Sequence, residues 1–195
     1  MSITTPSSGR AAAVPMANPF SGLTVGNDTW LTPRNIIQAL GPFDLDPATP
    51  PNMPWPTATM MLTPQDDGLS VEWPKAKFTF HNPPYGRGIE AWLEKAAKHG
   101  NGITLVFART ETAGFQEFVW KHPNTTGLFF ISGRLKFCRI DGTEAGSAGA
   151  PSVLVAYGAE ARRRLERAAA LGLIHGVLVD PPKASVATVR LAKAA

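Results

Sequence analysis

The chain has 195 residues, 44% of them hydrophobic and 17% charged, so it is long enough and apolar enough to form one domain with its own core. This composition excludes a disordered chain, and the single cysteine, Cys138, excludes an internal disulfide and a multi-cysteine zinc site. The formal net charge of +4 is compatible with a polyanionic partner but is too small to identify one.

Residues 1–26 are small, polar and interrupted by prolines, which predicts a flexible arm. This stretch lacks the charged and then apolar order of a signal peptide, and no apolar run in the chain is long enough to span a membrane. Together with the lone cysteine, these features lead us to expect a cytoplasmic protein that does not use a membrane.

The first predicted helix follows Trp30. Thr32 suits the N-cap, Pro33 suits the first helical position, and Gly41 is placed to end the helix. The apolar residues between Pro33 and Gly41 recur on one face, as an amphipathic helix requires.

A short strand is expected at 43–47. The next ten residues, 48–57, contain too many prolines for a helix or a central strand and predict a loop. A second short strand is expected at 58–62, and the residues 63–70 predict a turn.

A buried strand is predicted at 76–80, followed by a helix over 88–100 whose apolar residues recur at helical spacing. The continuous apolar run 102–108 predicts a second buried strand, and 112–121 predicts another helix.

Two strand-like segments, 127–133 and 136–140, come next without a helix between them. The residues 141–150 predict a glycine-rich loop, 151–158 a strand and 159–171 a helix. Apolar strands that alternate with helices predict an α/β fold with a mainly parallel sheet covered on both faces. The closely spaced later strands predict an antiparallel portion.

The tetrapeptide Asn-Pro-Pro-Tyr at 82–85 directly follows the strand expected at 76–80. Pro83 and Pro84 have a fixed φ and no N–H, and each restricts the residue before it to extended backbone. The result is a stiff loop at the carboxyl end of a strand, where open α/β sheets bind ligands. The alternative is an ordinary proline-rich turn at a strand end.

This loop presents two acceptors at a fixed spacing, the side-chain oxygen of Asn82 and the backbone carbonyl of Pro83. A planar amino group has two N–H donors that match them. Holding both donors orients the nitrogen and opposes delocalisation of its lone pair, while the ring of Tyr85 can stack on a flat substrate.

The tetrapeptide resembles motif IV of the amino-methyltransferases, which use S-adenosylmethionine to methylate exocyclic amines of adenine or cytosine, or glutamine amides. Three stretches between residues 29 and 97 narrow the resemblance: "TWLTPRNIIQALGPFDLDPAT", "TPQDDGLSVEW" and "FHNPPYGRGIEAWLEKA". Together with "FARTETAGFQEFVW" and "LFFISGRLKF", they resemble the small phage-type DNA adenine-N6 methyltransferase family (the phage Dam group) from about Trp30 to Gly158.

The resemblance implies a Rossmann-like methyltransferase fold over 27–182, with a seven-stranded, mostly parallel sheet, one antiparallel strand and helices on both faces. Residues 183–195 are then a C-terminal tail. The implied function is transfer of a methyl group from S-adenosylmethionine to N6 of adenine in DNA, in a bacterial or phage-infected cell. The alternatives are the same chemistry on RNA adenine, cytosine N4 or protein glutamine, and a non-catalytic DNA-binding relative.

By the same resemblance, the catalytic residues are Asn82, Pro83, Pro84 and Tyr85. The implied cofactor contacts are Thr32, Pro33, Asp44, Asp46, Pro47, Asp67 and Asn82. Among these, Asp46 is the candidate partner of the cofactor ammonium group and Asp67 the candidate partner of its adenine amine, with Asp66 as the alternative to Asp67. No glycine-rich turn follows Pro47, so we expect the ribose to be held differently, with Asn52 as a candidate.

The candidate DNA contacts are Tyr85, Arg87, Arg109, Arg134 and Lys136, of which the basic residues have structural ion pairs as their alternative role. The arginines between 162 and 167 are more typical of a solvated helix face. No histidine cluster has the spacing of metal ligands, so we expect no required metal. Neither the recognition sequence nor the oligomeric state follows from these residues.

Overall fold

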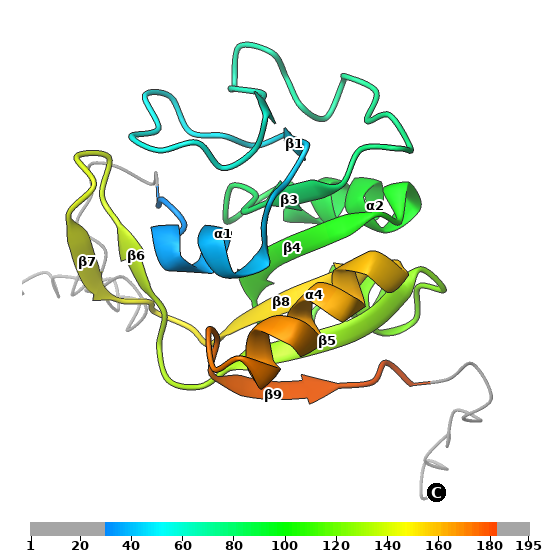
Figure 1. Cartoon of the computed structure of the whole chain (residues 1–195). Coiled ribbons are helices and arrows are strands. Elements are labelled where there is room, and N and C mark those ends of the chain that lie inside the picture. Colours follow the sequence, from blue (N-terminus) through cyan, green and yellow to red (C-terminus); the bar gives the residue numbers. More distant parts are fainter. Residues whose placement is uncertain (1–29, 183–195) are drawn as a thin grey trace, which may run out of the picture.

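Seven strands form the central sheet of the computed structural model, which describes residues 30–182 (Figure 1). In spatial order they are β2 (Met60–Met61), β1 (Leu45–Asp46), β3 (Thr79–His81), β4 (Gly102–Phe107), β8 (Ser152–Tyr157), β5 (Thr125–Ile131) and β9 (Gly176–Val179). Strands β2, β1, β3 and β4 pair in parallel, β8 is antiparallel to β4 and β5, and β9 is antiparallel to β5. Five strands therefore run one way, and β8 and β9 run the other way.

This sheet confirms the predicted fold class, with one difference at its edge. The sequence pattern predicted an antiparallel portion and the resemblance implied one antiparallel strand, whereas the sheet has two, β8 and β9. The expected N-terminal arm 1–26 and C-terminal tail 183–195 lie outside the described residues.

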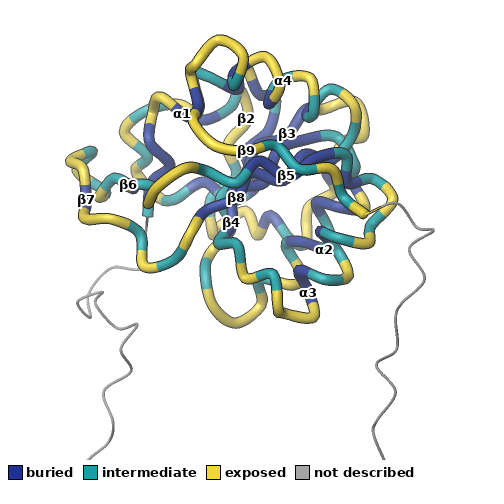
Figure 2. Tube along the Cα trace, turned by 90° about the horizontal axis from the view of Figure 1, so that it is seen from below, coloured by how far each residue is buried: buried dark blue, intermediate teal, exposed yellow. Residues whose placement is uncertain are grey.

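Helices cover both faces of the sheet. They are α1 (Arg34–Leu40), α2 (Ile89–His99), α3 (Ala113–Phe115) with the π-helical turn η1 (Gln116–Trp120), and α4 (Ala159–Ala170). The apolar faces of α1 and α4 share one buried cluster, and those of α2, α3 and η1 share another. Alternate residues of β8 enter the two clusters, so this strand is buried on both sides (Figure 2). None of the helices in the described part of the chain is long and apolar enough to cross a membrane.

The start of α1 differs from the prediction by one residue. Pro33 is the N-cap because its ψ of 136° is still extended, and the buried Thr32 makes no capping hydrogen bond to the helix. The chain is held extended up to this point by a bridge between Leu31 and Cys138, in which each backbone N–H donates to the other's carbonyl at 2.9 Å. Gly41 ends the helix as predicted, and its N–H donates to the Ile37 carbonyl.

The segment predicted as a glycine-rich loop instead contains a strand. β7 (Glu144–Ser147) pairs with β6 (Lys136–Cys138) as an antiparallel hairpin that projects from the sheet near α1 (Figure 1). The turn is stabilised by Asp141, which accepts hydrogen bonds from the backbone N–H and the hydroxyl of Thr143. These are cross-strand and turn contacts, and they leave no apolar periodicity in the sequence.

Strand β1 is the point at which the sheet changes direction. The chain passes from β1 to β2 on one side, without a helix, and then returns to β3 on the other side. A crevice forms at the carboxyl ends of the strands at such a switch point. The residues after β1 and the tetrapeptide after β3 therefore face the same space.

Candidate active site

A cavity of about 430 Å³ opens at the carboxyl ends of β1 and β3. This volume lies in the range of small-molecule sites. The lining residues come from the segment before α1, the loop after β1, the turn after β2, the tetrapeptide after β3 and helix α2. They are Trp30, Pro47, Ala48, Thr49, Pro50, Pro51, Thr63, Pro64, Asp67, Gly68, Asn82, Pro83, Pro84, Tyr85 and Trp92.

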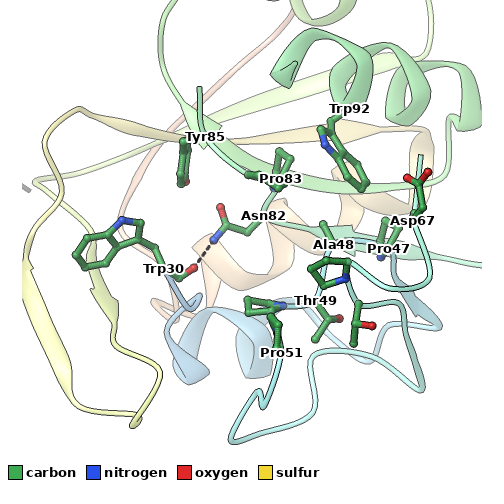
Figure 3. Close-up of a pocket in the computed structure, with 15 residues that line it drawn as sticks. Trp30, Pro47, Ala48, Thr49, Pro51, Asp67, Asn82, Pro83, Tyr85 and Trp92 are labelled. Carbon is green, nitrogen blue, oxygen red and sulfur yellow. Dashed lines mark hydrogen bonds between the residues drawn. The ribbon is translucent and has the colours of Figure 1, made fainter. Parts of the chain in front are cut away.

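The cavity has two chemically different ends (Figure 3). Trp30, Asn82 and Tyr85 lie at one end, and Trp92 and Asp67 lie at the other. The first end combines aromatic rings with an amide, and the second combines an aromatic ring with a carboxylate. Two different flat groups, each with an exocyclic amine, match these two ends.

The orientation of the Asn82 amide is fixed by the backbone. Its Nδ2 donates to the carbonyl oxygen of Trp30 at 3.0 Å (Figure 3). The other amide atom, Oδ1, is buried and has no hydrogen-bond partner among the described residues. A buried acceptor without a donor is costly in a folded protein, so this oxygen indicates a site for a ligand N–H.

Tyr85 presents one face of its ring to the cavity. Its other face stacks on Phe107, with ring centroids 4.2 Å apart and planes inclined by 17°, and its edge meets Phe137 of β6. Burial raises the pKa of Tyr85 well above its usual value, so the phenol stays neutral. The ring is therefore a fixed apolar platform.

Close backbone packing builds the opposite wall. A Cβ on Gly68 would lie 1.9 Å from the carbonyl oxygen of Pro47, so only glycine fits there. The Gly68 carbonyl accepts a hydrogen bond from the indole N–H of Trp73 at 2.8 Å. Lys95 secures the same loop through the Leu69 carbonyl, to which its Nζ donates at 2.6 Å.

Asp67 is the carboxylate that lines the cavity. Its backbone is left-handed, with φ of 48°, and its side chain accepts a hydrogen bond from the Ser70 hydroxyl. That hydrogen bond holds the pKa of Asp67 below its ordinary value, so the group is ionised at neutral pH. The neighbouring Asp66 accepts from the N–H and the hydroxyl of Thr63 and does not line the cavity.

Four of the predicted cofactor contacts are not among the residues that line the cavity: Thr32, Pro33, Asp44 and Asp46. Asp46 is buried, and its two carboxylate oxygens accept from the Ala48 N–H at 3.0 Å and from the Thr57 hydroxyl. Burial raises its pKa to about 6, against the lowering effect of these hydrogen bonds. Asp44 accepts from the Phe78 N–H at 2.8 Å.

The predicted DNA contacts gather along the carboxyl edge of the sheet. Arg87 follows β3, Arg109 follows β4 and Arg134 follows β5, and all three are exposed. None of the three forms an ion pair within residues 30–182. Lys136, in β6, pairs with Glu144 at 2.8 Å.

Three of the four arginines of α4 are different, because they form ion pairs within the described structure, whereas Arg167 forms none there. Arg163 and Arg164 both pair with Glu160, and Arg162 pairs with Glu166 and Asp180. Arg164 also lies over the ring of Phe78, 4.0 Å from its centroid. This helix has less free positive charge to offer a polyanion than the carboxyl edge has.

Nine of the fifteen residues that line the cavity were not predicted as site residues, among them Trp30, Gly68 and Trp92. Nothing in the sequence distinguishes Trp30 and Trp92 from core residues, and Gly68 lies in a segment for which only a turn was predicted. An apolar ring has the same sequence signature in a core and in a cavity wall, and the Gly68–Pro47 contact is not local. His81 is fully buried, and burial lowers its pKa to about 3. No cluster of three or more potential metal ligands occurs among the residues described.

The model of one protein family matches this chain, over residues 23–167: DNA N-6-adenine-methyltransferase (Dam). The matched range contains every residue that lines the cavity. Comparison with curated proteins and with solved structures gave no match.

Proposed function

Since this chain belongs to the DNA N-6-adenine-methyltransferase (Dam) family, we propose that it transfers the methyl group of S-adenosylmethionine to N6 of adenine in DNA. The family supplies the methyltransferase activity and the DNA substrate, and the α/β architecture is compatible with a Rossmann-like methyltransferase fold. The observation that carries the proposal is Oδ1 of Asn82, which lies at one end of the cavity and is buried without a hydrogen-bond partner among residues 30–182.

Asn82 and Pro83 hold the target amine. The side-chain oxygen of Asn82 and the backbone carbonyl of Pro83 accept the two N–H groups of adenine N6, and the ring of Tyr85 stacks on the base. Adenine has to leave the duplex to reach these groups. Pro84 has no N–H and restricts Pro83, so the two acceptors keep their spacing.

The opposite end of the cavity suits the cofactor. Asp67 offers an ionised acceptor for an adenine amine, Trp92 offers an apolar ring, and Pro47 with Ala48 forms the floor. Asp46 supports this floor, because its carboxylate accepts a hydrogen bond from the Ala48 N–H at 3.0 Å. When bound, S-adenosylmethionine supplies a methyl group on a positively charged sulfur.

The chain's own contribution to the reaction is alignment. While N6 accepts the methyl group that the bound cofactor would supply, the two oxygens would keep the nitrogen lone pair directed at that group. The nitrogen then carries four bonds and its proton becomes acidic, so the proton passes to solvent without a strong base.

The exposed arginines at the carboxyl edge provide the contact with the DNA backbone. Arg87, Arg109 and Arg134 lie at the ends of three strands that run in the same direction, and each is free of ion pairs in the described structure. Phosphate contacts of this kind position a duplex without reading its sequence. Lys136 extends the same edge onto the β6–β7 hairpin.

The test is incubation with DNA of mixed sequence and methyl-labelled S-adenosylmethionine, followed by mass spectrometry of the nucleosides. The expected product is N6-methyladenine. Label in cytosine N4, in RNA or in a peptide glutamine would assign the same chemistry to another amine. Saturable DNA binding without cofactor binding, measured by calorimetry, would make the chain a non-catalytic relative.

A further inference from the structure

We propose that Trp30 is a substrate-contacting residue, whose indole forms part of the wall around the flipped adenine while its backbone carbonyl fixes the Asn82 amide. This inference rests on the proposed function and identifies which end of the cavity takes the target base. It follows from three features of Trp30: its carbonyl contact, its attachment to the hairpin and its position in the cavity lining.

The carbonyl contact decides what Asn82 can do. An asparagine amide can turn either its oxygen or its nitrogen toward a ligand, and these two orientations have opposite hydrogen-bonding character. The Trp30 carbonyl accepts only, so at 3.0 Å it selects Nδ2 as its partner and leaves Oδ1 for the cavity. An amine ligand needs this orientation.

The backbone beside Trp30 is clamped on its other side. Leu31 and Cys138 exchange two backbone hydrogen bonds of 2.9 Å, which tie this segment to strand β6. Phe137, the neighbour of Cys138, in turn contacts the ring of Tyr85 edge to face. Trp30, the hairpin and Tyr85 therefore form one connected frame around the Asn82 end of the cavity.

The position of the indole matches a flat base. Trp30 is partly buried against the core cluster of α1 and α4, yet its side chain also lines the cavity. Figure 3 shows it at the same end as Asn82 and Tyr85, away from Trp92 and Asp67. Phe107 covers one face of the Tyr85 ring, and the free face can stack on one face of a purine. The other face of the purine is left uncovered by Tyr85. A second aromatic wall then helps to confine the base.

If Trp30 had only a structural role, its substitution would affect DNA methylation and cofactor binding alike, whereas a substrate contact affects DNA methylation alone. Substitutions at the two ends of the cavity distinguish these two roles. The variants are Trp30→Leu, Trp30→Phe and Trp92→Leu. For each, the KM for DNA and kcat are measured by methyl incorporation, and the Kd for S-adenosylmethionine by calorimetry without DNA.

We expect Trp30→Leu to lower kcat/KM for DNA by about five- to a hundredfold, because removal of one base–aromatic stack has an effect of this size. The Kd for S-adenosylmethionine should change by less than about twofold. Trp30→Phe should retain most of the activity. Trp92→Leu should show the reverse pattern, with the cofactor Kd raised. An unchanged kcat/KM in Trp30→Leu, or a loss of cofactor affinity comparable to that of Trp92→Leu, overturns the inference.

A second measurement covers the case in which Trp30→Leu does not fold. Stacking of a base on the Trp30 indole should quench part of the tryptophan emission of the wild type on titration with DNA, and Trp30→Phe should lack that part. Equal quenching in both proteins contradicts the inference. If the wild type itself methylates no DNA, the proposed function fails instead, and the two failures are thus distinguishable.

Discussion

Asn82 donates through Nδ2 to the carbonyl oxygen of Trp30 at 3.0 Å, and this contact makes Oδ1 the amide atom that faces the cavity. A residue separated from Asn82 by more than fifty positions in the chain thus sets the polarity of the site. The hydrogen-bonding character of Asn82 is therefore specified by backbone geometry as well as by residue type.

Substitution of Asn82 tests this arrangement directly. Asn82→Ala removes the acceptor, and Asn82→Asp places a carboxylate oxygen against the Trp30 carbonyl, where a donor is required. We expect both variants to lose at least about 100-fold in methyl transfer, as removal of a group that stabilises a transition state does, while cofactor affinity largely survives. Tritiated-methyl incorporation and calorimetry measure the two effects. The control is Asn35→Ala, because Asn35 lies on the exposed surface of α1. Turnover at the wild-type rate in Asn82→Asp would refute the role of the Trp30 carbonyl.

The two adjacent aspartates provide a matched pair. Asp67 lines the cavity, whereas Asp66 is engaged by Thr63 outside it. Asp67→Asn should raise the Kd for S-adenosylmethionine by about tenfold, which corresponds to about 1.4 kcal/mol. Asp66→Asn, which keeps an acceptor for Thr63, should change it by less than about twofold. Isothermal calorimetry at pH 7.5 makes the comparison, and an equal effect in both variants would contradict the assignment of Asp67.

Gly68 tests the close approach in the far wall. Gly68→Ala places a Cβ 1.9 Å from the Pro47 carbonyl oxygen, which the backbone can relieve only by moving the wall. We expect a loss of about 1–3 kcal/mol in the free energy of unfolding and a weaker cofactor affinity. Urea denaturation and calorimetry measure these effects. Gly146→Ala, where the new Cβ meets nothing within 4 Å, should leave both unchanged.

The arginines at the carboxyl edge and those of α4 should differ in the salt dependence of DNA binding. Arg109→Ala removes an exposed cation without an ion pair in the described structure, so the slope of log K against log salt should fall by about one. Arg163→Ala removes a cation already paired with Glu160 and should leave the slope unchanged. Fluorescence anisotropy across a salt series measures both slopes; a larger change in Arg163→Ala would move the DNA contact to α4.

Asp46 should make stability depend on pH. Its folded pKa of about 6 lies above its ordinary value of 3.8, so the folded chain retains a proton that the unfolded chain releases. Its stabilising contribution is therefore fully present below about pH 4 and is lost as the pH rises through 6. The free energy of unfolding, relative to Asp46→Asn, should fall by up to about 3 kcal/mol across this range. Urea denaturation at closely spaced pH values measures it, and parallel curves for the two proteins would show that Asp46 does not titrate this way.

The elements that could be predicted from the sequence have either a strong hydrophobic periodicity or conformationally restricted residues. Helix α2 and strands β4 and β8 have continuous apolar or helical patterns, and the prolines of the tetrapeptide fix the loop after β3 regardless of its surroundings. The tetrapeptide therefore marked the correct edge of the sheet before any geometry was known.

The features that could not be predicted depend on partners distant in sequence. Strand β7 exists because it pairs with β6, and β9 because it pairs with β5, although neither has a clear alternating pattern. The role of Asp46 at the cofactor stays a prediction, whereas its hydrogen bond from the Thr57 hydroxyl, eleven positions away, has no signal in the sequence. Which of two neighbouring aspartates faces the cavity likewise depends on the turn after β2.

The bridge between Leu31 and Cys138 connects the β6–β7 hairpin to the segment before α1, and through Trp30 to the loop that carries Asn82. Leu31 is covalently bonded to Trp30, whose carbonyl orients Asn82, so a tilt of the hairpin is transmitted to that amide within two peptide units. If the chain acts on DNA as proposed, a duplex in contact with the hairpin would therefore also act on the orientation of the Asn82 amide.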